Sequence, residues 1–304
     1  MKEDINIISN IGKAFRNNSD KKIVELDDKI NLASDYQIHR IEHLVQEFND
    51  YMPPNRMSHY FMAIVTDGTG EKSIGQYTFN VQPFTAMVVP VRGIHSSRNW
   101  SIQNKGYMLS FSDNLFIDLY FPKSFLNSLS LFKLSQIPYR YLSRELSDNL
   151  SAIFEEIIFE HNSSKALKKE MISLKIAELI IYYNRIFTSI EQIEGVHLTN
   201  DLYARFIDLL ETYFLTEKSV KFYADILAIH ANHLNSIVKK QSGYTAKENI
   251  QNRLLLEAKY LLASSTLTVK EIAFELGFED QNYFSHFFKA IQKMTPLEYR
   301  HKPV

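Results

Sequence analysis

Cysteine is absent from the 304-residue sequence, and so is any long uncharged apolar run. Without cysteine the chain can form no disulfide bond, thiolate metal site or thiol nucleophile. No stretch of about 18 apolar residues could cross a bilayer, and residues 1–5 lack the basic and apolar regions of a secretory signal. Several classes of enzyme and membrane protein are thereby excluded, and we expect a cytoplasmic protein.

An excess of one charge is also missing, because the net charge is −1 with histidine neutral. The whole chain therefore lacks the basic character of many nucleic-acid-binding proteins. From Lys218 onward, however, twelve Lys and Arg stand against eight Asp and Glu. This small surplus permits phosphate contacts without demonstrating them. The apolar content of 45% is enough to form the cores of about two domains.

The first part of the chain, from about residue 20 to 112, is expected to be rich in β-strands. Residues 60–65, 75–81 and 85–89 are short segments of β-branched and aromatic residues separated by turn residues. This spacing predicts a barrel or a sandwich. Two helical patterns follow at 145–160 and 166–187, the second with apolar residues at Leu174, Ala177 and Ile181. That helix packs on its own chain or forms a dimer contact.

An internal repeat occupies the carboxyl-terminal third of the chain. In residues 219–228 and 268–277, a Ser or Thr able to cap a first turn precedes apolar residues at i, i+3, i+4 and i+7. Each copy places a small alanine, Ala224 or Ala273, where a second helix must cross closely. Leu-Gly-Phe at 276–278 predicts a turn, after which a new helix can leave at a steep angle.

Each copy continues into a second helix with one apolar face. Burial of Leu234, Ile237 and Val238 in the first copy, and of Phe284, Phe287 and Phe288 in the second, leaves polar side chains outward. Short amides, hydroxyls and imidazole can reach base edges from a helix in a major groove, and lysine can reach phosphate. The predicted DNA-binding residues are therefore Asn232, Asn235, Ser236, Lys239, Gln281, Asn282, Ser285, His286 and Lys289.

A third helix is predicted between the copies. Thr245 and Glu248 have capping-box spacing and precede a helical pattern over residues 249–264. A rigid helix here would fix the separation of the two outward faces. Helices that enter successive major-groove segments on one side of a duplex should lie about 34 Å apart.

These segments resemble the signature of the AraC/XylS family of transcription regulators. The resemblance rests on RLLLEAKYLL at 253–262, Ile272-Ala273, GFEDQNYFSHFFK at 277–289 and TPLEYR at 295–300. It implies two helix-turn-helix subdomains joined by a helix, with the outward residues at positions that meet DNA. Three residues depart from the family pattern, namely Ala228 for a turn glycine, Ala246 for proline and His286 for a frequent arginine. Imidazole cannot make the bidentate guanine contact of a guanidinium.

The amino-terminal part resembles a cupin more distantly, through residues 90–99. Family members that pair a cupin-like barrel with this DNA-binding domain imply a small-molecule sensor. An interior lined by Tyr60, Tyr77, Phe79 and Phe84 could hold a ligand or be filled by those side chains. A metal site is not expected, because residues 55–61 offer one histidine and no acid. His95 is expected to be a loop residue at the end of a strand.

We therefore predict a multidomain β + α protein. It comprises a cupin-like sensor domain at 1–140, a helical connector at 141–198 that could dimerise, and a double helix-turn-helix domain at 199–304. The predicted function is sequence-specific regulation of transcription, with double-stranded DNA, RNA polymerase, an effector and a second copy as partners. No cofactor, metal, catalytic residue or membrane partner is expected. The alternatives are a metal-dependent cupin enzyme fused to a DNA-binding domain and a non-specific architectural DNA-binding protein. An alkyl-transfer repair enzyme is excluded, because that reaction requires a thiolate and the chain has no cysteine.

Overall fold

The computed structural model describes residues 35–44, 50–119, 125–188 and 197–301 of the chain. They form two compact units, which we treat separately. The amino-terminal unit contains strands and helices up to α6 (Lys168–Thr188), and the carboxyl-terminal unit contains the helices from α7 (His197–Tyr213) onward. Expected features at residues 20–34, and most of the expected boundary at 188–199, lie outside the described residues.

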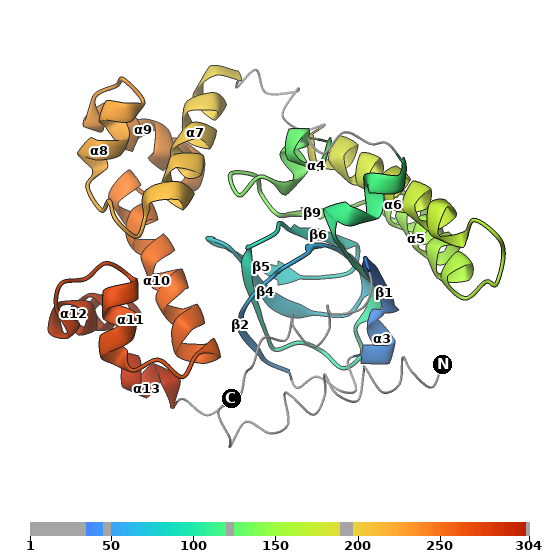
Figure 1. Ribbon diagram of the computed structural model, residues 1–304, viewed down its shortest axis with the longest axis horizontal. Helices are drawn as coiled ribbons and strands as arrows, with labels where there is room; N and C mark the ends of the chain where they lie inside the picture. Colours follow the sequence, from blue (N-terminus) through green and yellow to red (C-terminus); the bar gives the residue numbers. More distant parts are fainter. Residues whose placement is uncertain (1–34, 45–49, 120–124, 189–196, 302–304) are drawn as a thin grey trace. The chain divides into compact units, whose positions relative to one another are not determined.

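Two mostly antiparallel sheets form the centre of the amino-terminal unit (Figure 1). The five-stranded sheet has the order β1 (Tyr36–Arg40), β8 (Lys105–Phe111), β3 (Tyr60–Asp67), β6 (Thr85–Val89) and β9 (Tyr139–Tyr141). The four-stranded sheet has the order β2 (Met52–Arg56), β7 (Ile94–Arg98), β4 (Gly70–Ile74) and β5 (Tyr77–Val81). Short helical segments complete the unit, namely α3 (Ile41–Leu44), η1 (Asp113–Leu119), α4 (Phe125–Ser128) and η2 (Ser130–Phe132).

The predicted β + α class is confirmed, but the described strands form no closed barrel. Strands β1 and β9 end one sheet, and β2 and β5 end the other. The strand expected at 75–81 begins only at Tyr77, because Gly75 has a φ of 56° in the turn that joins β4 to β5. Left-handed backbone of this kind ends a strand and costs glycine little.

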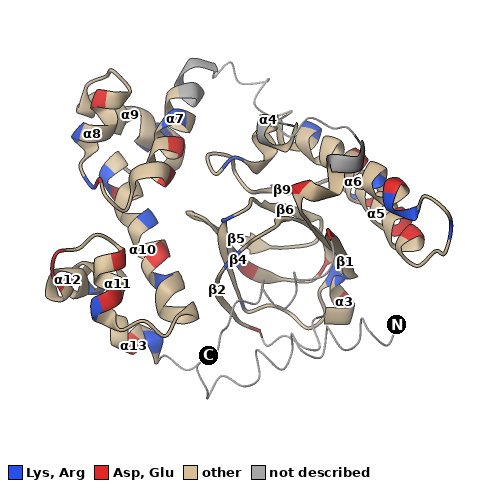
Figure 2. Cartoon of the chain, in the orientation of Figure 1, with Lys and Arg blue, Asp and Glu red and all other residues tan. Residues whose placement is uncertain are grey.

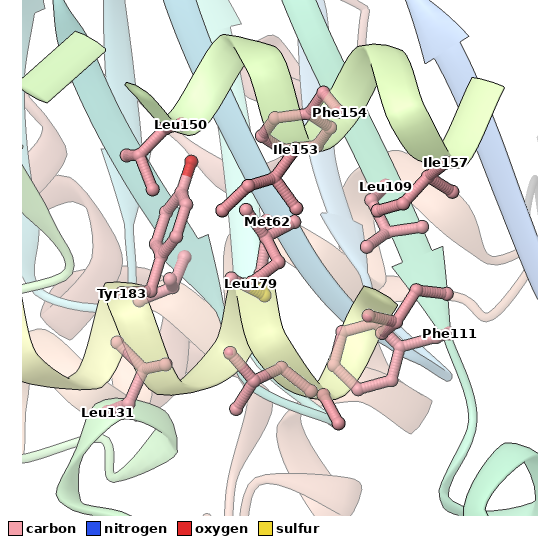
Figure 3. Packing of buried hydrophobic residues seen from close by; sticks show 14 of the residues in the cluster. Met62, Leu109, Phe111, Leu131, Leu150, Ile153, Phe154, Ile157, Leu179 and Tyr183 are labelled. Carbon is pink, nitrogen blue, oxygen red and sulfur yellow. The ribbon is translucent and has the colours of Figure 1, made fainter. Parts of the chain in front are cut away.

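Side-chain alternation along the strands divides the amino-terminal core into two layers. Along β3, Met62 and Ile64 face α5 (Arg144–His161) and α6, whereas Ala63 and Val65 face the four-stranded sheet. The layer under the helices is apolar and closely packed. Figure 3 shows its side chains from α5, α6, η2 and the sheet, including Leu150, Ile153, Phe154, Ile157, Leu179, Tyr183, Leu131, Met62, Leu109 and Phe111.

Helix α6 packs on its own chain, which was one of the two expected alternatives. Its buried face contains Ile176 and Ile180, and the Tyr183 hydroxyl donates a 2.9 Å hydrogen bond to the Ala63 carbonyl. Two of the apolar residues in the predicted helical pattern, Leu174 and Ile181, are exposed. The helix has apolar residues on both sides, so periodicity alone did not identify the buried one. Among the described residues, no helix is sufficiently long and apolar to span a membrane.

The four aromatic residues expected to line one interior lie in different places. Phe79 lies between the sheets and stacks on Tyr139 at 4.0 Å between ring centroids. Tyr60 packs in the layer under the helices, against Phe111 and Phe132. Tyr77 is half-buried, and Phe84 has a φ of 68° with the Arg144 guanidinium 5.2 Å above its ring. A single interior lined by all four is therefore incorrect.

Seven helices build the described part of the carboxyl-terminal unit, residues 197–301. After α7 come α8 (Val220–Ile226), α9 (Ala231–Ser242), α10 (Ala246–Ser264), α11 (Val269–Glu275), α12 (Gln281–Gln292) and α13 (Pro296–Arg300), as Figure 1 shows. The predicted capping box begins α10, because the Thr245 side chain accepts from the Glu248 amide and Glu248 accepts from the Thr245 amide. The pairs α8–α9 and α11–α12 are the two helix-turn-helix copies predicted by the repeat.

Candidate functional site

Each copy turns between its two helices with the same backbone hydrogen bonds. The Ile229 amide donates to the Ala224 carbonyl at 3.0 Å, and the Phe278 amide donates to the Ala273 carbonyl at 2.9 Å. The residue before each donor is in the left-handed region, with φ of 55° at Ala228 and 68° at Gly277. The expected turn is therefore present in both copies, although the first copy places a side chain where glycine has no steric cost.

The ends of the helices are capped differently in the two copies. Thr268 caps the start of α11, as predicted, and forms with Glu271 a capping box that was not predicted. Ser219 makes no side-chain capping bond at the start of α8, so this part of the prediction was wrong. The recognition helix of the second copy, α12, begins with an unpredicted cap, because the Asp280 carboxylate accepts from the amides of Asn282 and Tyr283.

Burial of the predicted apolar faces turns the polar faces of α9 and α12 outward. Leu234, Ile237 and Val238 are buried in the first copy, and Phe284 and Phe288 in the second, with Phe287 partly buried. Among the predicted DNA-binding residues, those with exposed side chains are Asn232, Ser236, Lys239, Gln281, Asn282, His286 and Lys289, and those half-buried are Asn235 and Ser285. Each copy thus presents amide groups and, among the predicted residues, one lysine on its exposed face.

Asn235 also has a partner inside the domain. Its side-chain oxygen accepts a 3.0 Å hydrogen bond from the Ala246 amide, which is one of the free amides in the first turn of α10. The sequence pattern did not predict this contact, since it joins two helices. The bond links the recognition helix of the first copy to the helix between the copies.

Two exposed residues on the same faces were not predicted. Tyr283, 71% exposed, follows Asn282 on α12, and His233 follows Asn232 on α9. In the alignment of the repeats His233 corresponds to Tyr283, just as Lys239 corresponds to Lys289. That correspondence was available in the sequence as a signal. Lys240 adds a second exposed cation to the last turn of α9.

The charges of the carboxyl-terminal unit are interspersed rather than grouped. Figure 2 shows Lys and Arg on several of its helices, with Asp and Glu among them. A salt bridge joins Arg253 of α10 to Glu211 of α7, and Arg253 also bonds to Glu257. The exposed lysines of α9 and α12 therefore supply local rather than global positive charge, as expected from the small surplus.

A polar cluster lies between the two sheets of the amino-terminal unit. Lys72 of β4 is 5% exposed, and its Nζ lies 2.8 Å from Nδ1 of His95 and 3.0 Å from Oγ of Ser97. Nε2 of His95 lies 3.1 Å from the Met57 sulfur. His95 is a buried residue of β7, so its assignment to a loop was wrong, and Lys72 was not predicted. An inward lysine on a strand gives no distinct signal in the sequence.

Burial controls the ionisation of this cluster. Desolvation lowers the pKa of Lys72 to about 7, and desolvation followed by the Lys72 charge lowers the pKa of His95 well below its ordinary value. No Asp or Glu in the described part of the chain forms an ion pair with Lys72. A buried ammonium without a carboxylate is unfavourable, so the cluster tends toward neutrality or requires an anion.

A metal site does not emerge from the described residues, which contain no group of three or more His, Asp or Glu able to hold an ion. His59 is half-buried beside the Ser58 hydroxyl, at 2.7 Å from Nδ1. His95 is occupied by Lys72 and Met57.

A family model described as a helix-turn-helix domain matches residues 223–302. The transcriptional activator RhaR of Escherichia coli is 30% identical over 147 residues, which are 47% of this chain and 51% of RhaR. The chain thus spans about half the length of the curated relatives it matches.

Solved structures give similar matches. The carboxyl-terminal domain of the response regulator YesN from Fusobacterium nucleatum is 28% identical, with a TM-score of 0.30, over 32% of this chain and 94% of that chain. ToxT from Vibrio cholerae is 17% identical, with a TM-score of 0.40, over 88% of this chain and 97% of that chain.

Paired helix-turn-helix copies with exposed polar second helices define a DNA-binding domain. The helix-turn-helix family model and the regulator RhaR match the chain in the way that its resemblance to the AraC/XylS family indicated.

The ionisation of Lys72 leads to a testable dependence of stability on pH. Between about pH 7 and the higher pKa of an exposed lysine, the unfolded chain binds one more proton than the folded chain, so the free energy of unfolding should rise with pH. The slope should be at most about 1.4 kcal/mol per pH unit. Urea unfolding followed by fluorescence of Trp100, the single tryptophan, measures it in the amino-terminal unit.

Lys72→Met should remove this rise between about pH 7 and 9.5. Lys105→Met, at an exposed position of β8, is the matched control and should retain it. An unchanged slope in Lys72→Met would show that Lys72 is charged in the folded protein over this range.

Proposed function

We propose that the chain is a sequence-specific DNA-binding regulator of transcription, with a sensor domain at 1–140 and a DNA-binding domain at 199–304. In this proposal α9 and α12 enter successive major-groove segments. The observation that carries it is the duplication of the whole arrangement: turn, buried face, exposed amide and exposed lysine occur in both copies. A structural helix pair would need no such equivalence on its solvent side.

Within this proposal the exposed residues divide into two roles. Asn232, Asn235, Ser236, Gln281, Asn282, Ser285 and His286 contact bases, and Lys239 and Lys289 contact phosphates. His286 supplies a single hydrogen bond rather than a bidentate contact. Asn235 can donate to DNA from its amide nitrogen, since its oxygen accepts from Ala246.

Substitutions on α12 should separate these roles. Gln281→Ala should cost about 1–3 kcal/mol and relax the base preference at one position of the site. Lys289→Ala should weaken binding to all sequences alike and reduce the log-log salt slope by about 0.9, the value for one phosphate. Fluorescence anisotropy with a fragment selected from randomised DNA, titrated at several salt concentrations, measures both effects.

Gln103→Ala, in an exposed loop of the amino-terminal unit, is the control and should change neither quantity. Equal losses on every sequence for both α12 variants would contradict the assigned roles. A wild-type protein that prefers no fragment over bulk DNA would instead indicate the non-specific architectural alternative.

We also propose that the chain forms a homodimer through the outer face of α6. Met171 and Leu174 are exposed on one turn of this helix and Ile181 and Tyr182 two turns further on, with the Lys175–Glu178 salt bridge between them and the opposite side of the helix buried in its own unit. Exposed apolar side chains on a packed helix are unfavourable in water. In a dimer with a two-fold axis, the same face of a second copy would cover them. A second copy is therefore the occupant that we infer.

Leu174→Glu should disrupt this dimer, because two carboxylates would be buried near the axis. Sedimentation velocity of the full chain should show a dimer for wild type and a monomer for the variant. Gln103→Glu adds the same charge elsewhere and should leave the dimer intact. An unchanged sedimentation coefficient for Leu174→Glu would place any dimer contact on another surface.

The amino-terminal unit is proposed to sense a small molecule with an anionic group and an apolar body. The polar cluster of Lys72, His95 and Ser97 lies among apolar residues between the sheets, and Lys72 has no carboxylate partner in the described part of the chain. A carboxylate reaching Lys72 would supply the missing charge and favour the protonated amine.

Matched probes can test this effector class. Benzoate and octanoate should raise the thermal unfolding midpoint reported by Trp100, whereas benzyl alcohol and 1-octanol should not. Lys72→Met should abolish the stabilisation and Lys105→Met should retain it. Equal effects of acids and alcohols, or no effect of either acid, would contradict an anion site at Lys72.

Activation through contact with RNA polymerase is the proposed outcome of DNA binding, in the cytoplasm. About half the length of the transcriptional activator RhaR matches this chain, and this similarity favours activation over repression as the proposal. Transcription in vitro from a template that carries the selected fragment should increase with added protein. A decrease would identify a repressor.

A further inference from the structure

The loop between α7 and α8 touches the second copy as well as the first. This loop, residues 214–219, is called the inter-copy loop below. On the side of the first copy, the Tyr223 hydroxyl of α8 donates a 2.7 Å hydrogen bond to the Glu217 carbonyl. The Phe214 amide donates to the Leu210 carbonyl of α7, so the loop is held to α7 at its start and to α8 near its end.

The closest contact with the second copy is at Gly277. A Cβ atom at this position would lie 2.1 Å from the Leu215 carbonyl oxygen, far inside contact distance. The backbone of the inter-copy loop therefore lies directly against the turn between α11 and α12. Ala228 has the same place in the first turn, carries a side chain and is exposed. The left-handed backbone alone does not demand glycine, but the approach of Leu215 does.

Lys218 adds a polar and an aromatic contact at the same place. Its ammonium donates to the Gly277 carbonyl and lies 4.4 Å from the centre of the Phe278 ring. Burial lowers the pKa of Lys218, and the nearby Glu279 charge partly opposes this shift. The ammonium is thus partly removed from water, a condition in which a cation–π contact gains strength.

Phe278 transmits this contact to the recognition helix. It is buried and packs against Tyr283, Phe284 and Phe287 of α12 at centroid distances of 6.1, 5.4 and 5.3 Å. Displacement of Phe278 would therefore disturb the base of α12. Dense aromatic packing transmits small shifts instead of absorbing them.

Arg253 holds the start of the inter-copy loop to α10. Its guanidinium lies 3.9 Å from the centre of the Phe214 ring and bonds to both Glu211 oxygens at 2.8 and 2.9 Å. The loop is consequently fixed to α7, α8 and α10 while it contacts the second turn. The two copies are therefore connected in two ways, through α10 and through the contacts of the inter-copy loop.

We infer that the inter-copy loop is a joint that sets the position of α12 relative to α9, with Lys218 and Gly277 as its positioning residues. The inference rests on the proposed paired contact with DNA. A single connecting helix would let the second copy tilt about the end of α10, whereas the joint adds a second point of attachment. The expected consequence is strict selection of the spacing between the two half-sites.

The test compares spacing selectivity in the full chain with and without the Lys218 contact. The probe is the fragment that wild type selects from randomised DNA, alone and with one base pair inserted or deleted between its half-sites. Wild type should bind the altered fragments about tenfold more weakly, comparable to the loss of one specific contact. Lys218→Met, which keeps the aliphatic stem, should reduce this ratio by about threefold, the worth of an exposed cation–π contact.

Lys221→Met is the matched control, because it removes the same charge from an exposed position of α8. It should change the affinity for all fragments by the same factor or not at all. The ratio between the selected and the altered fragments should therefore stay as in wild type. Gly277→Ala should lower the ratio further if it folds, as judged by circular dichroism. Lys218→Met keeps the test decisive if Gly277→Ala does not fold.

The outcomes distinguish the joint from the proposed function. If Lys218→Met weakens all fragments equally, Lys218 contacts phosphate or supports stability, and the joint is wrong. If wild type binds the inserted and deleted fragments as well as the original, spacing is not selected and the joint is also wrong. If wild type selects no fragment at all, the proposed function itself fails.

Discussion

Burial of one apolar side of α9 and of α12 is the interaction on which the rest of the account depends. Leu234 and Val238, and likewise Phe284 and Phe288, are essentially inaccessible to water. Because residues three and four apart share a helix face, this burial determines which polar groups point outward. The same burial orients each helix against its partner, so the exposed face and the fixed orientation have a common cause.

The two copies bury these faces with different types of apolar residue. The second copy is built around phenylalanines, with Phe278, Phe284 and Phe288 in one cluster, and its turn glycine lies against the inter-copy loop. The first copy uses aliphatic residues and accepts Ala228 at an exposed turn. Sequence duplication thus produced equivalent outward faces, whereas the internal packing diverged where the copies contact different neighbours.

The sequence predicted features that depend on neighbouring residues, but not contacts between residues far apart in the chain. Spacings of a few positions predicted the helix pairs, the capping box at Thr245, the cap at Thr268 and the outward residues. The bond from Asn235 to Ala246 and the contact of Leu215 with Gly277 join segments that meet only after folding. In the amino-terminal unit, short segments rich in β-branched and aromatic residues predicted strands, but not which strands pair in each sheet. Lys72 interrupts an inward apolar pattern, and only its neighbours His95 and Ser97 explain its burial.

Chemical footprinting with dimethyl sulfate tests the central claim most directly, because this reagent methylates guanine N7 in the major groove. On a selected fragment, the full chain should protect guanines in two segments about one helical turn apart on one side of the duplex. Protection confined to a single segment, or on opposite sides of the duplex, would contradict paired contact by α9 and α12.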